Sequence, residues 1–239
     1  MSLVLSWDAH ALTPKQFELL RFLQNHSIPI VAVQETFLTA NRRFSLPNYK
    51  IYRTDRQNAR GGTAILVHKG TKHTALSLPD LISAEATAVQ IEIDNKTITI
   101  VSIYSAPLTL DPRDISTIID RFHRVIVVGD FNAKHVNWNC RNSNAAGNKL
   151  QNWLDRRPDV DVLPPPEPTH FPPVGEPEIL DMALLRNANF HIEIANVTYL
   201  NSDHEPIIQA LRGQPARLPA PPRLNYNSAD CTAVRAIFN

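Results

Sequence analysis

The sequence predicts an α/β fold in which two mixed β-sheets pack face to face and a few helices cover their outer faces. Strand signals outnumber helix signals along the chain, and several strand-like runs show period-two alternation. With 239 residues, the chain is within the range of one large α/β domain and is long enough to bury a substantial core. Mixed strands with few flanking helices bury their apolar faces as packed layers.

Six segments have the apolar or alternating pattern of strands, and two of them are joined by a hairpin signal. The short polar sequence Asp94-Asn95-Lys96 is typical of a tight turn between paired strands. The predicted strands are 31–33, 63–67, 88–93, 97–103, 125–128 and 190–197.

Two helices are predicted from their start signals. Thr13 and Pro14 offer an N-cap and a proline at the first helical position, and Gln16 is placed to reach back to the cap. Asp111 and Pro112 repeat this arrangement. The apolar stripes expected behind these signals are Phe17, Leu20 and Leu23 in the first helix and Ile115, Ile118, Ile119 and Phe122 in the second, and a third helix is expected over 148–156.

Proline marks the segments where regular structure is not expected. Eight prolines lie between positions 158 and 177, and four more lie between 215 and 222. The second cluster predicts a linker. We therefore expect one domain over 1–212 and a Pro-rich tail over 213–239 that leads toward a downstream domain absent from this sequence.

Composition excludes several classes of protein. Two cysteines, Cys140 and Cys231, argue against a disulfide scaffold and suit a reducing compartment. No segment approaches the roughly 18 apolar residues of a membrane span, and the apolar start at 3–5 is too short for a signal peptide. The net charge of +1 gives no general attraction to nucleic acid, although a few local Lys and Arg side chains are enough to hold phosphates.

The octet 125–132, VIVVGDFN, is the most informative stretch. Its β-branched run predicts a buried strand, and we expect Gly129 to turn the chain where that strand ends. Asp130 and Asn132 would then lie at the lip of the sheet, where a catalytic site is expected. The alternative interpretation is a strand closed by a simple Gly-Asp turn.

Other polar residues also follow strand-like runs directly. Glu35 follows the apolar run 28–33, Tyr104 follows 97–103, and Asp203 and His204 lie near the end of the compact region. Taken singly, these are consistent with a surface turn, a capping aromatic residue and a polar turn before Pro206. Together they predict that one edge of the scaffold collects several catalytic side chains.

In combination these motifs resemble the endonuclease/exonuclease/phosphatase superfamily, and in particular the apurinic-endonuclease-like domain at the start of non-LTR (LINE-type) retrotransposon polyproteins. The resemblance extends over about 5–211 and implies a four-layer α/β/β/α sandwich of the DNase I-like type. The matching motifs are WDAHAL at 7–12, QET at 34–36, RGGTAI at 60–65, YSAP at 104–107, GDFNAKH at 129–135, LDMA at 180–183 and SDH at 202–204.

The chemistry of phosphodiester cleavage assigns roles by residue type. Glu35 is the first candidate for a metal ligand, and Asp130 can take a proton from water while Asn132 donates to a phosphate oxygen. His204 would bind the scissile phosphate as imidazolium, and Tyr104 would donate its hydroxyl to it.

The resemblance adds two roles that the residue types leave open. It implies that Asp181 orients His204 and that Asp203 lies near the metal, which we expect to be Mg²⁺ or Mn²⁺. Without the resemblance, the sequence Leu-Asp-Met-Ala favours the interpretation of Asp181 as a strand residue that pairs with a nearby arginine.

The chain departs from the family pattern at one position of the site. The family has Asn in a Trp-Asn-x-x-Gly-Leu pattern, whereas this chain has Asp8, with Ala11 in the Gly position. A carboxylate beside Glu35 either strengthens cation binding or forces one acid to remain protonated. We place Asp8 among the metal ligands and interpret His10 as a bystander.

Five residues are candidates for contact with DNA. Arg60 belongs to a Gly-rich loop that either approaches DNA or forms a flexible hairpin entry. His135 follows the predicted catalytic strand. The family carries a variable hairpin that probes the minor groove at about 170–177, and the other candidates are Thr169, His170 and Phe171.

These expectations describe a divalent-metal-dependent DNA endonuclease that nicks one strand and leaves a 3′-hydroxyl to prime reverse transcription. The expected partners are double-stranded target DNA and the reverse transcriptase domain of the same polyprotein, with no membrane partner. We expect an isolated monomeric domain, made in the cytoplasm and active in the nucleus. The alternatives are a target-site binding module weakened by Asp8 and another superfamily phosphodiesterase, such as an abasic-site endonuclease.

Overall fold

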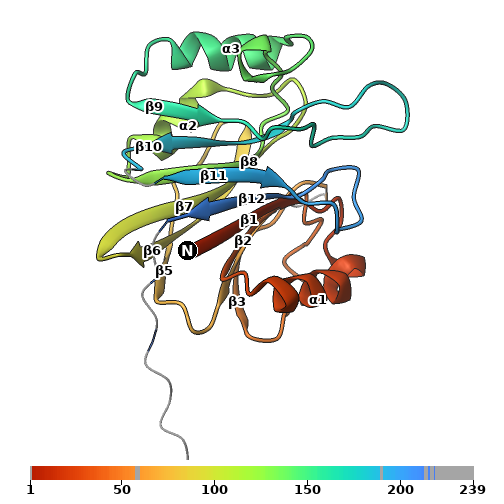
Figure 1. Cartoon of the computed structure of the whole chain (residues 1–239), viewed down its shortest axis with the longest axis vertical. Coiled ribbons are helices and arrows are strands. Elements are labelled where there is room, and N and C mark those ends of the chain that lie inside the picture. The colour runs from red at the N-terminus through yellow and green to blue at the C-terminus, as the bar shows by residue number, and fades with distance from the viewer. Residues whose placement is uncertain (1, 57–59, 189–190, 213–214, 216–217, 219–239) are drawn as a thin grey trace, which may run out of the picture.

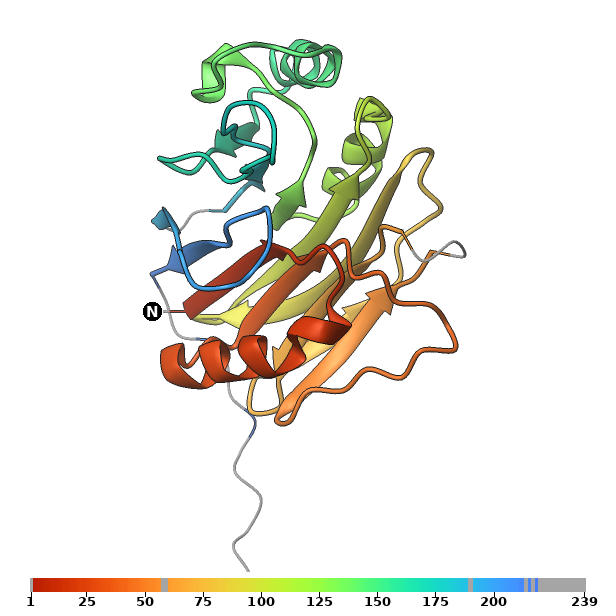
Figure 2. The same cartoon turned by 90° about the vertical axis from the view of Figure 1, so that its right-hand side faces the viewer.

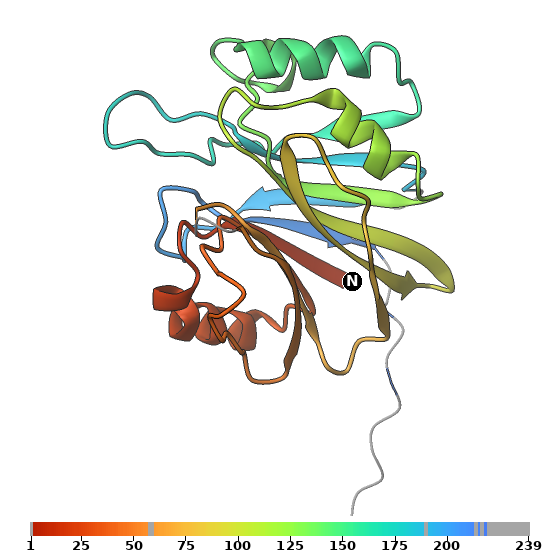
Figure 3. The same cartoon turned by 180° about the vertical axis from the view of Figure 1, so that it is seen from behind.

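The computed structural model describes residues 2–56, 60–188, 191–212, 215 and 218. Two sheets of six strands each are stacked face to face, with α1 (Gln16–His26) outside one sheet and α2 (Pro112–Ile119) and α3 (Ala145–Leu154) outside the other (Figures 1 and 2). Seen from behind, α2 and α3 lie on one side of the molecule and α1 lies on the other (Figure 3). The predicted α/β/β/α layering is confirmed.

The first sheet has the strand order β11-β12-β1-β2-β4-β3. Its central pair, β1 and β2, is parallel, and the remaining neighbours are antiparallel. The strands are β1 (Ser2–Asp8), β2 (Ile30–Gln34), β3 (Tyr49–Thr54), β4 (Thr63–His68), β11 (Ile192–Asn196) and β12 (Ile207–Leu211). Phe190, where a strand was expected to begin, lies outside the described residues.

The second sheet has the strand order β5-β6-β7-β8-β10-β9, and its parallel pair is β7 and β8. Asp94 and Asn95 both have positive φ, 47° and 61°, which confirms the predicted hairpin as a tight turn. The strands are β5 (His73–Leu76), β6 (Ala84–Ile93), β7 (Lys96–Ser105), β8 (Val125–Asp130), β9 (Val160–Leu163) and β10 (Asp181–Arg186). The expectation of no regular structure over 158–177 was wrong for β9, which forms an edge strand between two prolines.

The helix predictions were correct in number but not in every boundary. Asp111 caps α2 by accepting from the Arg113 N–H, as predicted. Thr13 does not cap α1; it begins a 3₁₀ turn, η1 (Thr13–Lys15), and Gln16 donates to the Ser45 carbonyl. The predicted apolar stripe of the first helix was also partly wrong. Phe17 is 82% exposed, and the buried face of α1 is formed by Leu19, Phe22 and Leu23. The third helix begins earlier than predicted and is capped by Asn144.

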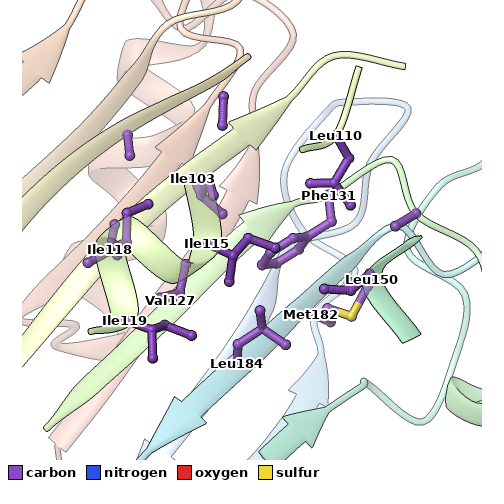
Figure 4. Packing of buried hydrophobic residues seen from close by; sticks show 14 of the residues in the cluster. Ile103, Leu110, Ile115, Ile118, Ile119, Val127, Phe131, Leu150, Met182 and Leu184 are labelled. Carbon is purple, nitrogen blue, oxygen red and sulfur yellow. The ribbon is translucent and has the colours of Figure 1, made fainter. Parts of the chain in front are cut away.

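The core has three apolar clusters that correspond to the interfaces between layers. One lies between α1 and the first sheet, and another lies between the two sheets. In the third, side chains of α2 and α3 pack on the second sheet, where Ile115, Ile118 and Ile119 face Val127, Phe131 and Leu184 (Figure 4). Alternation along each strand explains this arrangement, since Leu5 and Trp7 face α1 while Val4 faces the other sheet.

Gly129 allows the two parallel strands of the second sheet to approach closely. We expected it to end its strand, but β8 continues through Asp130. Gly129 has φ 147°, and a Cβ atom there would lie 2.0 Å from the Ile103 carbonyl oxygen. Only glycine permits this contact, which places Asp130 opposite Tyr104 on β7.

After Arg212, the chain is described only at Pro215 and Leu218. Pro215 forms a bridge with Ile93, and the Leu218 N–H donates to the Gly70 carbonyl. The division into a domain over 1–212 and a linker over 213–239 stays a prediction. Among the described residues, none of the helices is both long and apolar enough to cross a membrane.

Candidate active site

Side chains from both sheets meet where the central strands end. Asp8, the last residue of β1, is paired in register with Gln34 at the end of β2, and Glu35 follows directly. In the second sheet, Tyr104 is paired with Asp130, and Asp130 is paired with Asp181 at the start of β10. The strand register therefore collects the predicted catalytic residues at one edge of the sandwich.

Asp181 and His204 form a buried pair. The Asp181 Oδ2 atom lies 2.7 Å from His204 Nδ1, and the two residues are 2% and 7% exposed. Burial alone would lower the pKa of His204, but the Asp181 carboxylate outweighs it, so that the pKa lies well above the usual value for histidine. With Nδ1 bound to Asp181, the Nε2 atom is the one left to act on a ligand. This is the orienting arrangement that the resemblance implied.

Thr169 holds Asp181 in position. Its hydroxyl oxygen accepts from the backbone N–H groups of Leu180 and Asp181, both at 3.1 Å, and its side chain is fully buried. We had expected Thr169 to contact DNA, but the structure places it behind the catalytic pair. A buried threonine that accepts two N–H groups fixes the start of β10 and hence the carboxylate that orients His204.

Asn132 orients Asp130 in this structure. The Asn132 backbone N–H donates to Asp130 Oδ1 at 2.7 Å, and its side-chain amide donates to Asp130 Oδ2 and to the Ser105 carbonyl. Asn132 has φ 46°, which turns its amide back onto Asp130. Burial raises the pKa of Asp130 well above its ordinary value, His204 opposes this shift, and Asp181 adds to it.

Glu35 is held between Tyr104 and His10. The Tyr104 hydroxyl donates to Glu35 Oε1, while His10 Nδ1 lies 3.1 Å from Glu35 Oε2. Burial and then this hydrogen bond raise the pKa of Tyr104, so the phenol remains protonated and able to donate. His10 Nδ1 also lies 3.8 Å from Asp203 Oδ1, which makes His10 a member of the site and not the bystander we expected.

Asp8 is buried and only half satisfied. Its Oδ1 accepts from the His10 N–H at 3.0 Å, but Oδ2 has no hydrogen-bond partner among the described residues. Burial raises the pKa of Asp8 well above its ordinary value, and Glu35 and Asp130 add to this against an opposing effect of His204. Desolvation is therefore the main cause of the raised pKa, and the neighbouring carboxylates contribute less.

Asp203 and His170 complete the cluster beside His204. Burial raises the pKa of Asp203, but His204 and then His10 lower it by more, so the carboxylate is charged at neutral pH. The His170 ring lies 4.6 Å from that of His204, centroid to centroid. His170 was expected on a DNA-probing hairpin and instead faces the catalytic histidine.

The other three residues expected to contact DNA are at least partly exposed and lie outside the strands. Arg60 is exposed on the loop whose Gly61 and Gly62 carbonyls accept from the backbone after Glu35. Phe171 is 42% exposed and begins the segment between the bridge partners His170 and Glu178. His135 caps a short 3₁₀ turn, η2 (Val136–Trp138), by accepting from the Asn137 N–H.

The donor set fits a divalent cation. Two buried carboxylate oxygens, Asp8 Oδ2 and Asp181 Oδ1, have no hydrogen-bond partner in the described part of the chain, which is unfavourable unless positive charge lies nearby. Asp8, Asp130 and His204 offer ligand atoms that all lie within 4.8 Å of one another. Glu35 and Asp203 add two carboxylates on the side of His10. Hard cations such as Mg²⁺ and Mn²⁺ prefer such oxygen-rich sets.

Comparison with known proteins agrees with this geometry. Residues 98–208 match the protein family described as endonuclease-reverse transcriptase. The matched segment contains six of the eight predicted catalytic and metal-binding residues: Tyr104, Asp130, Asn132, Asp181, Asp203 and His204.

Two curated relatives come from mobile elements of Drosophila melanogaster. The RNA-directed DNA polymerase from mobile element jockey is 28% identical over 237 residues, which cover 94% of this chain and 25% of that protein. The probable RNA-directed DNA polymerase from transposon X-element is 29% identical over 216 residues, which cover 87% of this chain and 24% of that protein. This chain thus spans about a quarter of the length of these relatives.

Solved structures share the fold. The endonuclease domain of TRAS1, a telomere-specific non-LTR retrotransposon, superposes with a TM-score of 0.69 at 19% identity, covering 89% of this chain and 99% of that domain. The Xenopus laevis APE2 catalytic domain gives a TM-score of 0.65 at 15% identity, covering 89% of this chain and 92% of that domain. These findings confirm the predicted DNase I-like sandwich and the resemblance to retrotransposon endonuclease domains.

Sequence reasoning missed a buried polar link between the two sheets. The Gln34 amide, which is fully buried, donates to the Ser102 hydroxyl at 2.8 Å, and that hydroxyl donates to the Val33 carbonyl at 3.0 Å. This link ties β2 to β7 one residue before Glu35 and two before Tyr104. Both residues lie in apolar runs, where a lone polar side chain gives no signal of its partner in the other sheet.

Proposed function

We propose that this domain is a Mg²⁺- or Mn²⁺-dependent endonuclease that nicks one strand of double-stranded DNA and leaves a 3′-hydroxyl end. The single observation that carries the proposal is the Asp181–His204 pair, at 2.7 Å, beside the buried carboxylate of Asp130. This combination supplies a cationic donor for a phosphate and an acceptor for a proton of water, which are the two groups that hydrolysis of a phosphodiester needs.

Asp130 is the candidate base for the attacking water. Its two oxygens accept from Asn132, which holds the carboxylate plane in one orientation. Because burial raises its pKa, ionised Asp130 is more basic than an exposed aspartate and takes a proton more readily. The same shift predicts that activity falls on the acid side, where Asp130 becomes protonated.

His204 is the candidate donor to the scissile phosphate. Asp181 keeps it in the imidazolium form by raising its pKa, so Nε2 presents a charged N–H to the oxygen on which negative charge develops. Tyr104 supplies a second donor from the neighbouring strand. Glu35 and Asp8 would hold the cation, which when bound supplies charge for the phosphate and for the departing 3′ oxygen.

Under this proposal the nick primes reverse transcription by a reverse transcriptase domain of the same polyprotein. The support is that both Drosophila relatives are named as RNA-directed DNA polymerases and are about four times as long as the matched segment. We further propose that the domain acts as a monomer in the nucleus, after synthesis in the cytoplasm, because its substrate would be chromosomal target DNA.

A second candidate is a DNA-binding module whose catalysis is weakened by Asp8. The observation that favours it is the buried Asp8 carboxylate, whose unpartnered oxygen adds negative charge where the family has a neutral amide. In this case the chain would bind target DNA, but Mg²⁺ would not produce nicks.

Nicking of supercoiled plasmid with Mg²⁺ distinguishes the two candidates. We expect conversion to open circles by the wild-type chain, prevented by EDTA. Glu35→Ala, Asp130→Ala and His204→Ala should each lower the rate by about 10² to 10⁴, the usual effect of removing a base or a charge-stabilising group. Circular dichroism checks that each variant is folded. Wild-type nicking by Asp130→Ala would contradict the assignment, and binding without nicking by the wild type would favour the second candidate.

A further inference from the structure

We infer that His170, Asp203 and His204 form a second cation site, one that takes a borderline transition metal such as Zn²⁺ and withdraws His204 from the scissile phosphate. The three residues each offer one ligand atom, and these atoms all lie within 4.8 Å of one another. The binding claim is independent of the proposed nuclease activity, whereas the inhibitory consequence rests on it.

The backbone fixes this arrangement. The Phe171 N–H donates to the Asp203 carbonyl at 2.7 Å, and the Glu205 N–H donates to the Thr169 carbonyl at 2.6 Å. His170 and His204 are thereby antiparallel bridge partners. Side chains of directly opposed residues lie on the same face, about 5 Å apart at Cβ, so the two imidazoles meet without any distortion of the chain.

The distance between two of the ligand atoms can be compared with that in a tetrahedral site. Ligands about 2.0 to 2.1 Å from Zn²⁺ lie roughly 3.4 Å from one another. The His170 Nε2 atom is 3.9 Å from Asp203 Oδ2, and a small side-chain rotation closes the remaining gap. Because His170 and Asp203 have side chains 23% and 34% exposed, an ion can reach the site from solvent and keep water as a fourth ligand.

The surroundings of His204 suit a metal-binding imidazole. Histidine ligands usually donate their second ring N–H to a carboxylate, which fixes the tautomer and increases ligand basicity. Asp181 does this for His204 at 2.7 Å, leaving Nε2 directed away from Asp181. The Asp203 and Asp181 carboxylates also provide the negative charge that balances a divalent cation.

The imidazole donors distinguish this site from the carboxylate set at Asp8 and Glu35. Imidazole suits Zn²⁺ and the later first-row metals, whereas Mg²⁺ prefers oxygen ligands and keeps much of its water. Zn²⁺ bound to Nε2 of His204 would occupy the atom that donates to the phosphate. The site therefore takes a different metal and has an inhibitory effect.

Equilibrium Zn²⁺ binding, measured by competition with a chromogenic chelator, tests the site directly. His170→Phe removes the ring nitrogens but keeps a ring against His204. We expect it to weaken Zn²⁺ binding at least about tenfold, the lower end of what a disturbed metal shell costs, with little change for Mg²⁺. The same exchange at His191, a 60% exposed histidine paired with Glu193 at 3.0 Å, is the matched control and should leave Zn²⁺ affinity unchanged.

Equal Zn²⁺ affinity in wild type and His170→Phe would overturn the site. If that variant does not fold, Asp203→Asn removes the carboxylate ligand and should weaken Zn²⁺ binding in the same way. The inhibitory consequence is measured as the Zn²⁺ concentration that halves each protein's own Mg²⁺-dependent nicking rate. This concentration should rise for His170→Phe but not for His191→Phe, and an equal rise or no rise in both would refute the inhibition. Absence of nicking in the wild type would contradict the proposed function and leave the Zn²⁺ result standing.

Discussion

Replacing Asp181 by Asn removes one charge from the buried pair while keeping nearly the same shape. In the wild type, burial is the largest single influence on His204 and lowers its pKa, and Asp181 provides the largest opposing effect. Without the carboxylate, the largest effect that opposes burial is lost, and only the smaller effects of Asp8 and Asp130 remain. We therefore expect His204 in Asp181→Asn to be neutral at pH 7, whereas it is an imidazolium ion in the wild type.

The expected loss of rate follows from the role of the charge. Removing a group that stabilises the developing negative charge costs about 10² to 10⁴ in rate. Since each factor of ten corresponds to about 1.4 kcal/mol, this is about 3 to 5 kcal/mol of transition-state stabilisation. The substitution should affect the rate of the bound complex more than binding, because His204 acts on charge that develops during the reaction.

Stability should change with pH in a defined direction. A histidine whose folded pKa is raised stabilises the fold fully below its unfolded value, about 6.5, and this contribution is lost as pH rises through the folded pKa. The difference in unfolding free energy between wild type and Asp181→Asn should therefore be largest below about pH 6.5 and narrow at higher pH. Thermal unfolding in EDTA at several pH values measures it.

The assay is single-turnover nicking in Mg²⁺ across about pH 5 to 9, the range that includes both limbs of the expected profile. The alkaline limb should move to lower pH in Asp181→Asn, because His204 loses its proton earlier. Asp159→Asn is the matched control, since Asp159, like Asp181, is paired with a basic side chain but lies outside the site; its carboxylate is 2.8 Å from both Arg157 and Arg186. An Asp181→Asn profile that coincides with the wild-type profile would refute the assignment of His204 as the charged donor.

Other parts of the structure give predictions for three further variants. Asp8→Asn should raise the Tm of the metal-free protein at neutral pH. The reason is that burial raises the pKa of Asp8, so its ionisation destabilises the fold as pH rises above about 4. Equal Tm values of the two proteins in EDTA at pH 7 would contradict this. In nicking assays across about pH 5 to 7, the same variant should be faster or less dependent on pH, and a steep fall at every pH would show that Asp8 is a required metal ligand. Gly129→Ala should lower the unfolding free energy by about 3 kcal/mol or more in denaturant titrations, since its Cβ would meet a backbone oxygen, whereas Gly70→Ala, which meets only a side chain, should cost much less. Exchanging 171–177 for a Gly/Ser segment should change which sites on a long labelled duplex are nicked more than it changes the average nicking rate, because groove contacts and shape set sequence preference. An unchanged cleavage pattern would refute this role of the loop.

The fold was largely predictable because its strands have strong local signals. The residues at 125–128 are all β-branched, and they lie in the buried strand β8. The N-cap Asp111 also lies where the sequence predicted a helix start. Local signals failed where a competing contact decided the outcome. Thr13 and Pro14 have the signature of a helix start, yet this segment forms a 3₁₀ turn and Gln16 bonds to the distant Ser45 carbonyl.

The site was predictable in its strand-end residues and not in those that join it through tertiary contacts. Asp130, Glu35 and His204 each lie within a recognisable motif. Strand pairing places Asp130 and Glu35 at the strand ends, and the bond to Asp181 joins His204 to them. His10 meets Glu35 and Asp203 across 25 and 193 positions of the chain, and no local pattern marks such a contact. Thr169 was misplaced for the same reason, since its hydroxyl acts on backbone N–H groups about ten residues further along.

The chemistry of the cut ends tests the central claim most directly. Supercoiled plasmid nicked by the purified chain in Mg²⁺ should serve at once as a primer for a DNA polymerase, without prior treatment by a phosphatase. The account predicts labelled extension products from the nicks made by the wild type and none from His204→Ala or from the wild type in EDTA. Nicks that need phosphatase treatment before extension, or extension products of equal amount from His204→Ala, would contradict it.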